Sequence, residues 1–130
     1  MSELREKIKQ TIESEPVVLF MKGTPDRVYC GNSGRALEAL RSVGAPVTAV
    51  DVLPDPQIRQ ELSVVSNWPT IPQVFVGGEL VGGADIVQEL AETGELKEKL
   101  DAALGDSRLE SRTERVVQVS GTFTPFRLVP

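Results

Sequence analysis

One short run of apolar residues does most to constrain the fold of this chain. Residues 17–21 read Val-Val-Leu-Phe-Met, with no polar position in either register. A half-exposed strand would alternate apolar and polar residues, so this run predicts a central strand that is buried on both faces. Such a strand needs helices above and below its sheet, and we therefore expect an α/β fold.

Segments with helical spacing of apolar residues precede and follow this strand. Leu4, Ile8 and Ile12 recur every four positions among charged residues, which predicts a surface helix that ends before Pro16. Asp55 and Pro56 supply a cap and a first-turn proline for a later helix. The ranges with helical spacing after the first strand are 33–43, 55–65, 85–90 and 96–104.

Further strands are predicted between these helices. Residues 47–52 indicate a second strand, and residues 73–76 and 79–81 flank Gly77-Gly78, a pair that favours a tight hairpin. The resulting order is helix, strand, helix, strand, helix, hairpin, helix, helix. It predicts a four-stranded mixed sheet, first half parallel and second half antiparallel, with helices on both faces.

The chain is expected to divide into a domain over residues 1–104 and a tail over residues 105–130. Residues 106–115 carry mixed charges, and residues 116–130 alternate polar and apolar side chains. Two interpretations stay open. The tail is solvated and disordered, as chain ends often are, or residues 116–119 and 122–128 add a strand or hairpin to an exposed sheet edge.

The charged and reactive residues exclude several functions. Histidine is absent, which removes Ser-His and Cys-His catalytic pairs and imidazole metal sites. The net charge of −5 offers no basic surface for nucleic acid. The single cysteine forms no internal disulfide, so we expect a reducing, cytoplasmic location. No apolar run approaches the roughly 18 residues of a membrane helix, and the charged amino terminus is unlike a signal peptide.

Cys30 is the candidate reactive residue. It lies between a loop and a predicted helix, where backbone N–H groups and the helix dipole favour a thiolate. The alternative is a small buried hydrophobe, but a thiol at a strand-to-helix junction favours reactivity. Cys30-Gly31-Asn32-Ser33 has the spacing of a dithiol redox motif with serine in the second position. Its chemistry must therefore end in an external thiol, a second chain or a shared metal centre.

Three further segments could bind a ligand. Pro72 marks a strand start or a cis peptide bond, because proline does not fit inside a strand ladder. Gly82 and Gly83 precede a helix start at Asp85, where backbone N–H groups could meet a carboxylate. Arg59 is a cation on the predicted helix over residues 55–65. Taken singly, Pro72 is better explained by an ordinary turn and Arg59 by a solvated helix face.

Together these segments resemble the glutaredoxin family, and more narrowly its monothiol branch. The segments that carry the resemblance are residues 20–25, Cys30-Gly31, residues 66–73 and residues 78–86. The resemblance spans residues 1 to about 104 and implies a thioredoxin-like fold. The branch usually has phenylalanine where this chain has Asn32 and a basic residue where it has Gly34.

The resemblance also implies a ligand and its binding residues. Lys22 and Arg59 would pair with the glycyl carboxylate of glutathione, and Ile71 and cis-Pro72 would bind its cysteinyl backbone. Ala84 and Asp85 would hold the γ-glutamyl end. Two cations, an exposed peptide edge and a helix amino terminus suit a small anionic tripeptide.

Members of the branch carry a 2Fe–2S cluster, and the resemblance implies the same cofactor here. Each protomer of a homodimer would give the Cys30 thiolate and one bound glutathione thiolate, which makes four sulfur ligands. Cluster-accepting proteins or a BolA-like protein are the further partners that it implies.

Three functions are compatible with these residues and with the resemblance. The first is the glutathione-dependent cluster carrier or sensor. The second is a weak monothiol oxidoreductase, in which Cys30 removes glutathione from protein mixed disulfides. The third is an interaction protein in which the fold and tail serve docking and the thiol is idle.

Overall fold

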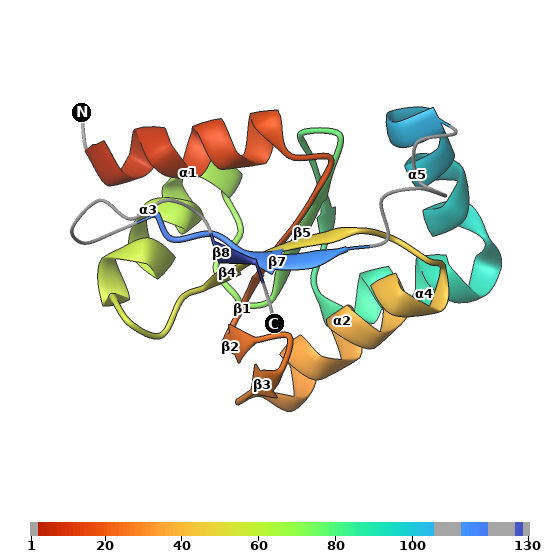
Figure 1. Ribbon diagram of the computed structural model, residues 1–130, viewed down its shortest axis with the longest axis horizontal. Helices are drawn as coiled ribbons and strands as arrows, with labels where there is room; N and C mark the ends of the chain where they lie inside the picture. Colours follow the sequence, from red (N-terminus) through yellow and green to blue (C-terminus); the bar gives the residue numbers. More distant parts are fainter. Residues whose placement is uncertain (1–2, 106–112, 120–126, 129–130) are drawn as a thin grey trace.

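The computed structural model describes residues 3–105, 113–119 and 127–128, and these residues form one main sheet between helices (Figure 1). The sheet has the strand order β6-β5-β1-β4-β7-β8. A separate two-stranded sheet pairs β2 (Gly23–Thr24) with β3 (Arg27–Val28) just before Cys30. The strands of the main sheet are β1 (Val17–Met21), β4 (Val47–Asp51), β5 (Gln73–Val76), β6 (Glu79–Gly82), β7 (Glu114–Val116) and β8 (Arg127–Leu128).

The sheet is mixed, as predicted. β1 runs parallel to β4 and antiparallel to β5, and β5 runs antiparallel to β6. Gly77 and Gly78 connect β5 to β6 with positive φ angles of 59° and 84°. Positive φ at both central residues is what the predicted tight hairpin requires, and glycine adopts it without steric cost.

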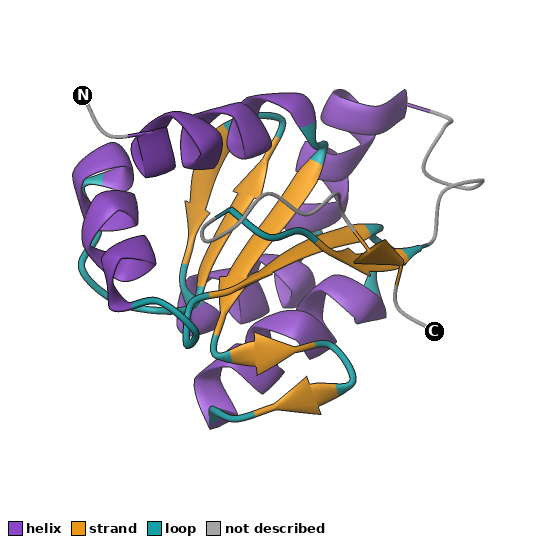
Figure 2. Cartoon of the chain, turned by 60° about the vertical axis from the view of Figure 1, so that its left-hand side comes forward, coloured by secondary structure: helices purple, strands orange, loops and turns teal. Residues whose placement is uncertain are grey.

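Helices cover both faces of the sheet (Figure 2). One face packs against α2, α4 and α5, and the other packs against α1 and α3. The helices are α1 (Glu3–Ser14), α2 (Gly31–Ser42), α3 (Pro56–Ser66), α4 (Ala84–Thr93) and α5 (Glu95–Leu104). None of the helices in the described residues is long and apolar enough to span a membrane.

The strand β1 divides the core as its sequence predicts. Val17, Leu19 and Met21 join the cluster under α2, α4 and α5, whereas Val18 and Phe20 join the cluster under α1 and α3. Successive side chains of a strand point to opposite faces, so five consecutive apolar residues fill both layers. The prediction of a central strand buried on both faces is confirmed, because every residue of β1 is buried.

The number of strands differs from the prediction. We expected four strands, and these are present as β1, β4, β5 and β6, but β7 and β8 extend the sheet beyond β4. β7 pairs in parallel with β4, and β8 pairs antiparallel with β7. β7 uses the N–H and C=O groups of the β4 edge, which would stay unpaired in a four-stranded sheet. Residues 106–112 and 120–126 of the expected tail lie outside the described residues.

Side-chain contacts fasten β7 to the rest of the molecule. The guanidinium of Arg41 on α2 donates two hydrogen bonds to the Glu114 carboxylate, at 2.7 and 2.8 Å. Arg115 forms an ion pair with Glu15, whose carboxylate also accepts a hydrogen bond from Thr48 on β4. Beyond the strand, Val119 is 2% exposed and belongs to the core cluster under α1 and α3. Glu114–Val119 is therefore part of the packed structure.

Candidate functional site

Cys30 occupies the N-cap position of α2. Its backbone is extended, with φ of −144° and ψ of 130°, and its carbonyl accepts a hydrogen bond from the Gly34 N–H at 2.9 Å. The first N–H groups of a helix have no partner within the helix, so they point toward the residue at its N-cap. The helix predicted to follow Cys30 is thus confirmed, and its first turn places backbone N–H donors near the thiol.

These donors favour the thiolate form of Cys30. The Ser33 backbone N–H near the sulfur is the main cause that lowers the pKa of the Cys30 thiol below its ordinary value. The Asn32 N–H, the Ser33 hydroxyl and the positive charge of Lys22 lower the pKa further, while partial burial opposes them. Cys30 is also partly exposed to solvent. A partly exposed thiol with a lowered pKa has the properties of a reactive nucleophile or a metal ligand.

Ser33 has a role that the sequence did not reveal. Its side chain is fully buried, and its Oγ accepts a hydrogen bond from the Lys22 backbone N–H at 3.0 Å. That bond uses an oxygen lone pair and leaves the hydroxyl proton for the Cys30 sulfur. The only sequence signal was the serine in the second cysteine position of the redox spacing. The structure shows that this serine ties the end of β1 to α2 beneath the thiol.

A groove of about 280 Å³ begins beside this helix start. Asn32, two residues after Cys30, lines it together with residues that the resemblance assigned to glutathione. Those residues are Ile71, Pro72, Ala84 and Asp85, and Trp68, Thr70, Gly83 and Ile86 complete the lining. Residues from α2, the loop before β5 and the start of α4 thus meet at one groove.

The loop before β5 presents its backbone to the groove. The Ile71–Pro72 peptide bond is cis, which agrees with one of the two sequence interpretations of Pro72. No backbone hydrogen bond in the described part of the chain uses the Ile71 N–H or C=O. An extended ligand backbone could therefore pair with Ile71 as a short added strand.

Gln73 shapes this loop, although the sequence analysis gave it no role. Its side chain is completely buried, and its Nε2 donates to the carbonyl oxygens of Trp68 at 2.8 Å and Thr70 at 3.1 Å. A buried amide with two backbone acceptors fixes the path of the loop that lines the groove. On the opposite wall, a Cβ at Gly83 would stand 3.3 Å from the Pro72 carbonyl oxygen, so glycine permits the close approach of the two walls.

The start of α4 forms the far end of the groove. Its N-cap is Gly83, which makes no side-chain capping hydrogen bond. Ala84 is 7% exposed, whereas the Asp85 side chain is 89% exposed. An uncapped helix start with its backbone N–H groups beside a groove favours a carboxylate ligand.

The two predicted cations lie outside the lining of the groove. Lys22 follows β1 and is half-buried, and Arg59 is exposed on α3. Neither forms an ion pair with another residue in the described ranges. They are available to a carboxylate, but the structure does not bring them to the groove wall as it does Ile71, Pro72, Ala84 and Asp85.

Apolar side chains are exposed close to Cys30 in the sequence and at the groove. Tyr29 is 62% exposed and Val28 is 38% exposed, just before Cys30, and Ile86 at the groove is 38% exposed. Exposed apolar side chains mark a contact surface where they form one contiguous patch. No sequence pattern had indicated that these three side chains would be exposed.

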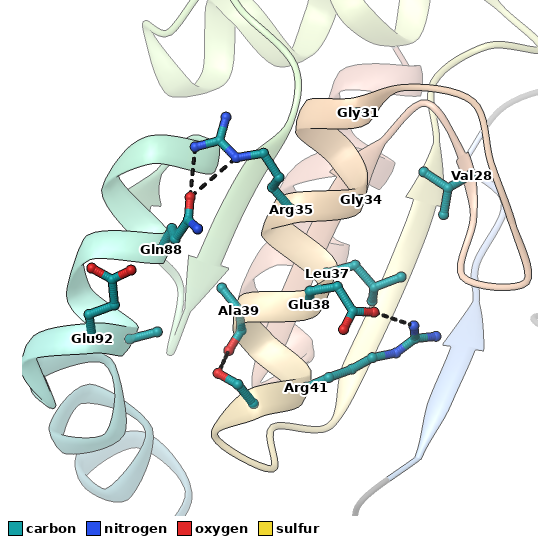
Figure 3. A pocket seen from close by; sticks show the side chains of 12 residues that line it. Val28, Gly31, Gly34, Arg35, Leu37, Glu38, Ala39, Arg41, Gln88 and Glu92 are labelled. Atoms are coloured by element: carbon teal, nitrogen blue, oxygen red, sulfur yellow. Dashed lines mark hydrogen bonds and ion pairs between the residues drawn. The ribbon is translucent and has the colours of Figure 1, made fainter.

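A larger cavity, of about 540 Å³, lies between α2 and α4 (Figure 3). Gly31, Gly34 and Arg35 line it, but none of the residues predicted to bind glutathione does. The size of this cavity does not indicate which ligand it would bind. The smaller groove, in contrast, combines uncapped helix N–H groups with the unpaired backbone of Ile71. The smaller groove is the better candidate site.

Comparison with known proteins adds three findings. The family model described as Glutaredoxin matches residues 17–81. Glutaredoxin 4 of Buchnera aphidicola is 44% identical over 100 residues, which cover 77% of this chain and 93% of that protein. Monothiol glutaredoxin-S11 of Oryza sativa is 50% identical over 97 residues, but the match spans 75% of this chain and only 20% of the rice protein.

Solved structures give the same architecture. The solution structure of reduced poplar apo GrxS14 is 41% identical, with a TM-score of 0.69 over 77% of this chain and 92% of that one. The crystal structure of the buckwheat glutaredoxin-glutathione complex is 28% identical, with a TM-score of 0.68 over 77% of this chain and 89% of that one. The predicted thioredoxin-like α/β fold is confirmed.

Proposed function

We propose a function from the premise that this chain belongs to the glutaredoxin family, among its monothiol members. It binds glutathione in the groove beside Cys30, and it carries a 2Fe–2S cluster between two protomers. The observation that carries this proposal is the position of the only cysteine. Its thiolate is stabilised at the start of α2, two residues before the groove wall formed by Asn32.

Several features support glutathione as the ligand. The unpaired backbone of Ile71 suits the cysteinyl residue, and the uncapped start of α4 at Ala84 and Asp85 suits the γ-glutamyl end. Lys22 and Arg59 supply positive charge for the glycyl carboxylate. A similar protein from buckwheat has been crystallised as a glutathione complex, which supports the same class of ligand here.

The ligand count supports a cluster that is shared between chains. The chain has one cysteine and no histidine, and the described residues contain no group of three His, Cys, Asp or Glu that could hold a metal. One protomer therefore offers one thiolate. Two Cys30 thiolates and two glutathione thiolates would supply the four sulfur ligands that a 2Fe–2S cluster requires. The exposed side chains of Val28, Tyr29 and Ile86 would lie at or near the face between the protomers.

Anaerobic reconstitution tests this function. The protein is incubated with iron, sulfide and glutathione, and visible absorption is recorded together with iron and sulfide counts. The proposal expects sulfur-to-iron absorption that is lost in Cys30→Ser and in the absence of glutathione. A matched control is Ser42→Ala, which changes an exposed position on the same helix. A colourless wild-type protein would contradict the cluster proposal.

A glutathione-dependent oxidoreductase is the second candidate, and the thiolate at Cys30 favours it. The Cys30 thiolate attacks a protein–glutathione disulfide, forms a Cys30–glutathione disulfide and releases the protein thiolate. A second glutathione thiolate then attacks that disulfide, releases oxidised glutathione and restores Cys30. Ser33 cannot take the second role because it has no thiol. Turnover of a glutathionylated peptide by a colourless protein would favour this candidate, and absence of turnover would exclude it.

Asn32→Phe helps to separate the two candidates. The substitution introduces the residue usual in the monothiol branch and leaves Cys30 and the groove residues Ile71, Pro72, Ala84 and Asp85 unchanged. If Asn32 weakens the cluster, Asn32→Phe will increase cluster yield without increasing peptide turnover. The proposed recipients of the cluster are cluster-accepting proteins or a BolA-like partner, and the proposed location is the cytoplasm.

A further inference from the structure

Arg35 joins the two helices that meet at the candidate groove. From α2 its Nη2 donates to the Asp85 carboxylate at 2.5 Å and to the Gln88 amide oxygen at 2.7 Å, both on α4. Its Nε also donates to Gln88, at 3.2 Å, and Figure 3 shows this reach from one helix to the other. Its Nη1 donates to the Asn32 amide oxygen at 3.0 Å.

These contacts fix two residues of the groove wall. Asn32 and Asp85 both line the groove, although they come from different helices, and Arg35 lies between them. Both side chains are otherwise exposed, and Asp85 in particular is 89% exposed. Without a common partner, such side chains would sample several rotamers. The planar guanidinium holds both at once, which a single-point ammonium could not do.

The hydrogen bonds also determine which atoms remain for a ligand. The Asn32 oxygen is occupied by Arg35, so the amide nitrogen Nδ2 remains as a donor. The Asp85 Oδ1 is occupied, so Oδ2 remains as an acceptor. The start of α4 adds uncapped backbone N–H groups. Donors for an anion and one acceptor for a cation thus lie at the same end of the groove.

This pattern is complementary to an α-amino acid group, which carries a carboxylate and an ammonium on one carbon. The carboxylate would accept from the Asn32 amide and the α4 backbone, and the ammonium would donate to Asp85. We propose that Asn32, Arg35 and Asp85 form one specificity unit for the free amino-acid end of a γ-glutamyl ligand, with Arg35 as the positioning residue. This inference rests on the proposed binding of glutathione.

The test compares two disulfides that react with the same thiol. Glutathione disulfide carries the γ-glutamyl group, and cysteinylglycine disulfide has the same Cys-Gly part without it. In each reaction the Cys30 thiolate attacks one sulfur, a new disulfide forms and the other half leaves as a thiolate. The rate constant for each is measured by mass spectrometry of the Cys30 adduct, and their ratio reports recognition of the γ-glutamyl group.

Arg35→Gln should lower this ratio about tenfold, because charge-assisted hydrogen bonds that orient Asn32 and Asp85 are lost. The rate with cysteinylglycine disulfide should stay within about twofold, since Cys30 and its donors are unchanged. Asn32→Ala should lower the ratio as well, and adding it to Arg35→Gln should lower it little further, because both act on one unit. Lys97→Gln on α5 removes the same charge at an exposed position and should keep the wild-type ratio.

Each result has a distinct meaning. A wild-type ratio in Arg35→Gln, or an equal loss of both rates, would overturn the inference and leave glutathione binding intact. A wild-type protein that shows no preference for glutathione disulfide would instead contradict the proposed function. Independent, additive effects of Arg35→Gln and Asn32→Ala would show that the two residues do not form one unit.

Discussion

At the scale of single residues, the reactivity of Cys30 depends on a small set of donors at the start of α2. The Ser33 backbone N–H contributes most, and the Ser33 hydroxyl and Lys22 contribute further. All of them stabilise the thiolate relative to the thiol, so the folded chain should hold Cys30 ionised at a lower pH than an unfolded chain does. Nucleophilic attack and metal ligation both need that thiolate.

Alkylation of Cys30 across a pH series measures this effect. The midpoint for reaction with iodoacetamide should lie below about 8.5, the ordinary value for a cysteine thiol. Ser33→Ala removes the hydroxyl donor but keeps the backbone N–H, so it should raise the midpoint part of the way back. Ser42→Ala, which removes a hydroxyl near the other end of α2, should leave the midpoint unchanged. A wild-type midpoint at or above the ordinary value would contradict the account.

The candidate site was only partly predictable at this scale. The positions of Cys30, Pro72 and Ala84 follow from local sequence signals, namely a helix start, a proline before a strand and a glycine pair before a helix. The bond between Arg35 and Asp85 joins residues that are 50 positions apart, and no spacing rule connects them. The same holds for Ser33, whose partner Lys22 lies between β1 and β2, 11 positions away.

At the scale of elements, α2 begins at the reactive cysteine and contains, near that start, a residue that disfavours helix formation. Gly34 lies in the first turns of the helix, where glycine is less favourable than alanine because it loses more backbone freedom on folding. A Cβ at Gly34 would meet only Val28 Cγ1, at 3.6 Å, which is an ordinary van der Waals contact. Nothing in the local packing therefore requires glycine at this position.

Gly34→Ala should stabilise the protein by about 0.5–1 kcal/mol. Gly23→Ala is the matched contrast and should destabilise it, because Gly23 has a φ of 103° and a Cβ there would stand 2.3 Å from the Arg27 carbonyl oxygen. Urea unfolding of both variants measures the two changes. A loss of stability in Gly34→Ala would mean that the helix start needs glycine for a reason other than packing.

The element β7 shows why part of the fold escaped the sequence analysis. The alternating pattern after residue 115 allowed either a solvated tail or a strand, because alternation says nothing about the edge with which a strand will pair. The pairing depends on contacts across the fold. Arg41 on α2 faces Glu114, and the Val47 N–H and the Ala49 C=O bond to Thr113 and Val117. The central strands were predictable because their runs of consecutive apolar residues indicate burial on both faces of the sheet.

Val119 supplies a test of this packing. It is 2% exposed and lies in the core cluster with Ile8 and Phe20. Val119→Ala should lower the free energy of unfolding by roughly 1–3 kcal/mol, from lost burial and the cavity left behind. Val64→Ala is the control, because Val64 is 59% exposed on α3 and should cost much less. Equal stability of Val119→Ala and the wild type would show that this segment is not packed in solution.

At the scale of the whole molecule, an ion pair connects the C-terminal strands to the helix that carries the thiol. Arg41 donates to Glu114 on β7, to Glu38 on α2 and, at 3.4 Å, to the Pro25 carbonyl in the loop between β2 and β3. The hydrogen bond from Arg41 is the main cause that lowers the pKa of Glu114. The Arg41 guanidinium thus links β7, α2 and the hairpin that precedes Cys30.

The lowered pKa of Glu114 predicts a dependence of stability on pH. The unfolded chain binds this proton more tightly than the folded chain, so the stabilisation is complete above the ordinary carboxyl pKa of about 4.3. It is lost as the pH falls through the lower pKa of the folded state. Glu114→Gln should therefore cost about 0.5–1 kcal/mol at pH 7 and progressively less below pH 4, as urea unfolding at each pH will show. A cost that does not change with pH would contradict the ion pair.

The central claim is that two protomers share one cluster through two Cys30 thiolates and two glutathione thiolates. Native mass spectrometry of the anaerobically reconstituted protein tests it most directly, because mass counts every component. We predict one dominant species, with the mass of two chains, two glutathione molecules and one 2Fe–2S cluster, that is absent in Cys30→Ser. A cluster on a single chain, or a cluster-bearing dimer that contains no glutathione, would contradict the account.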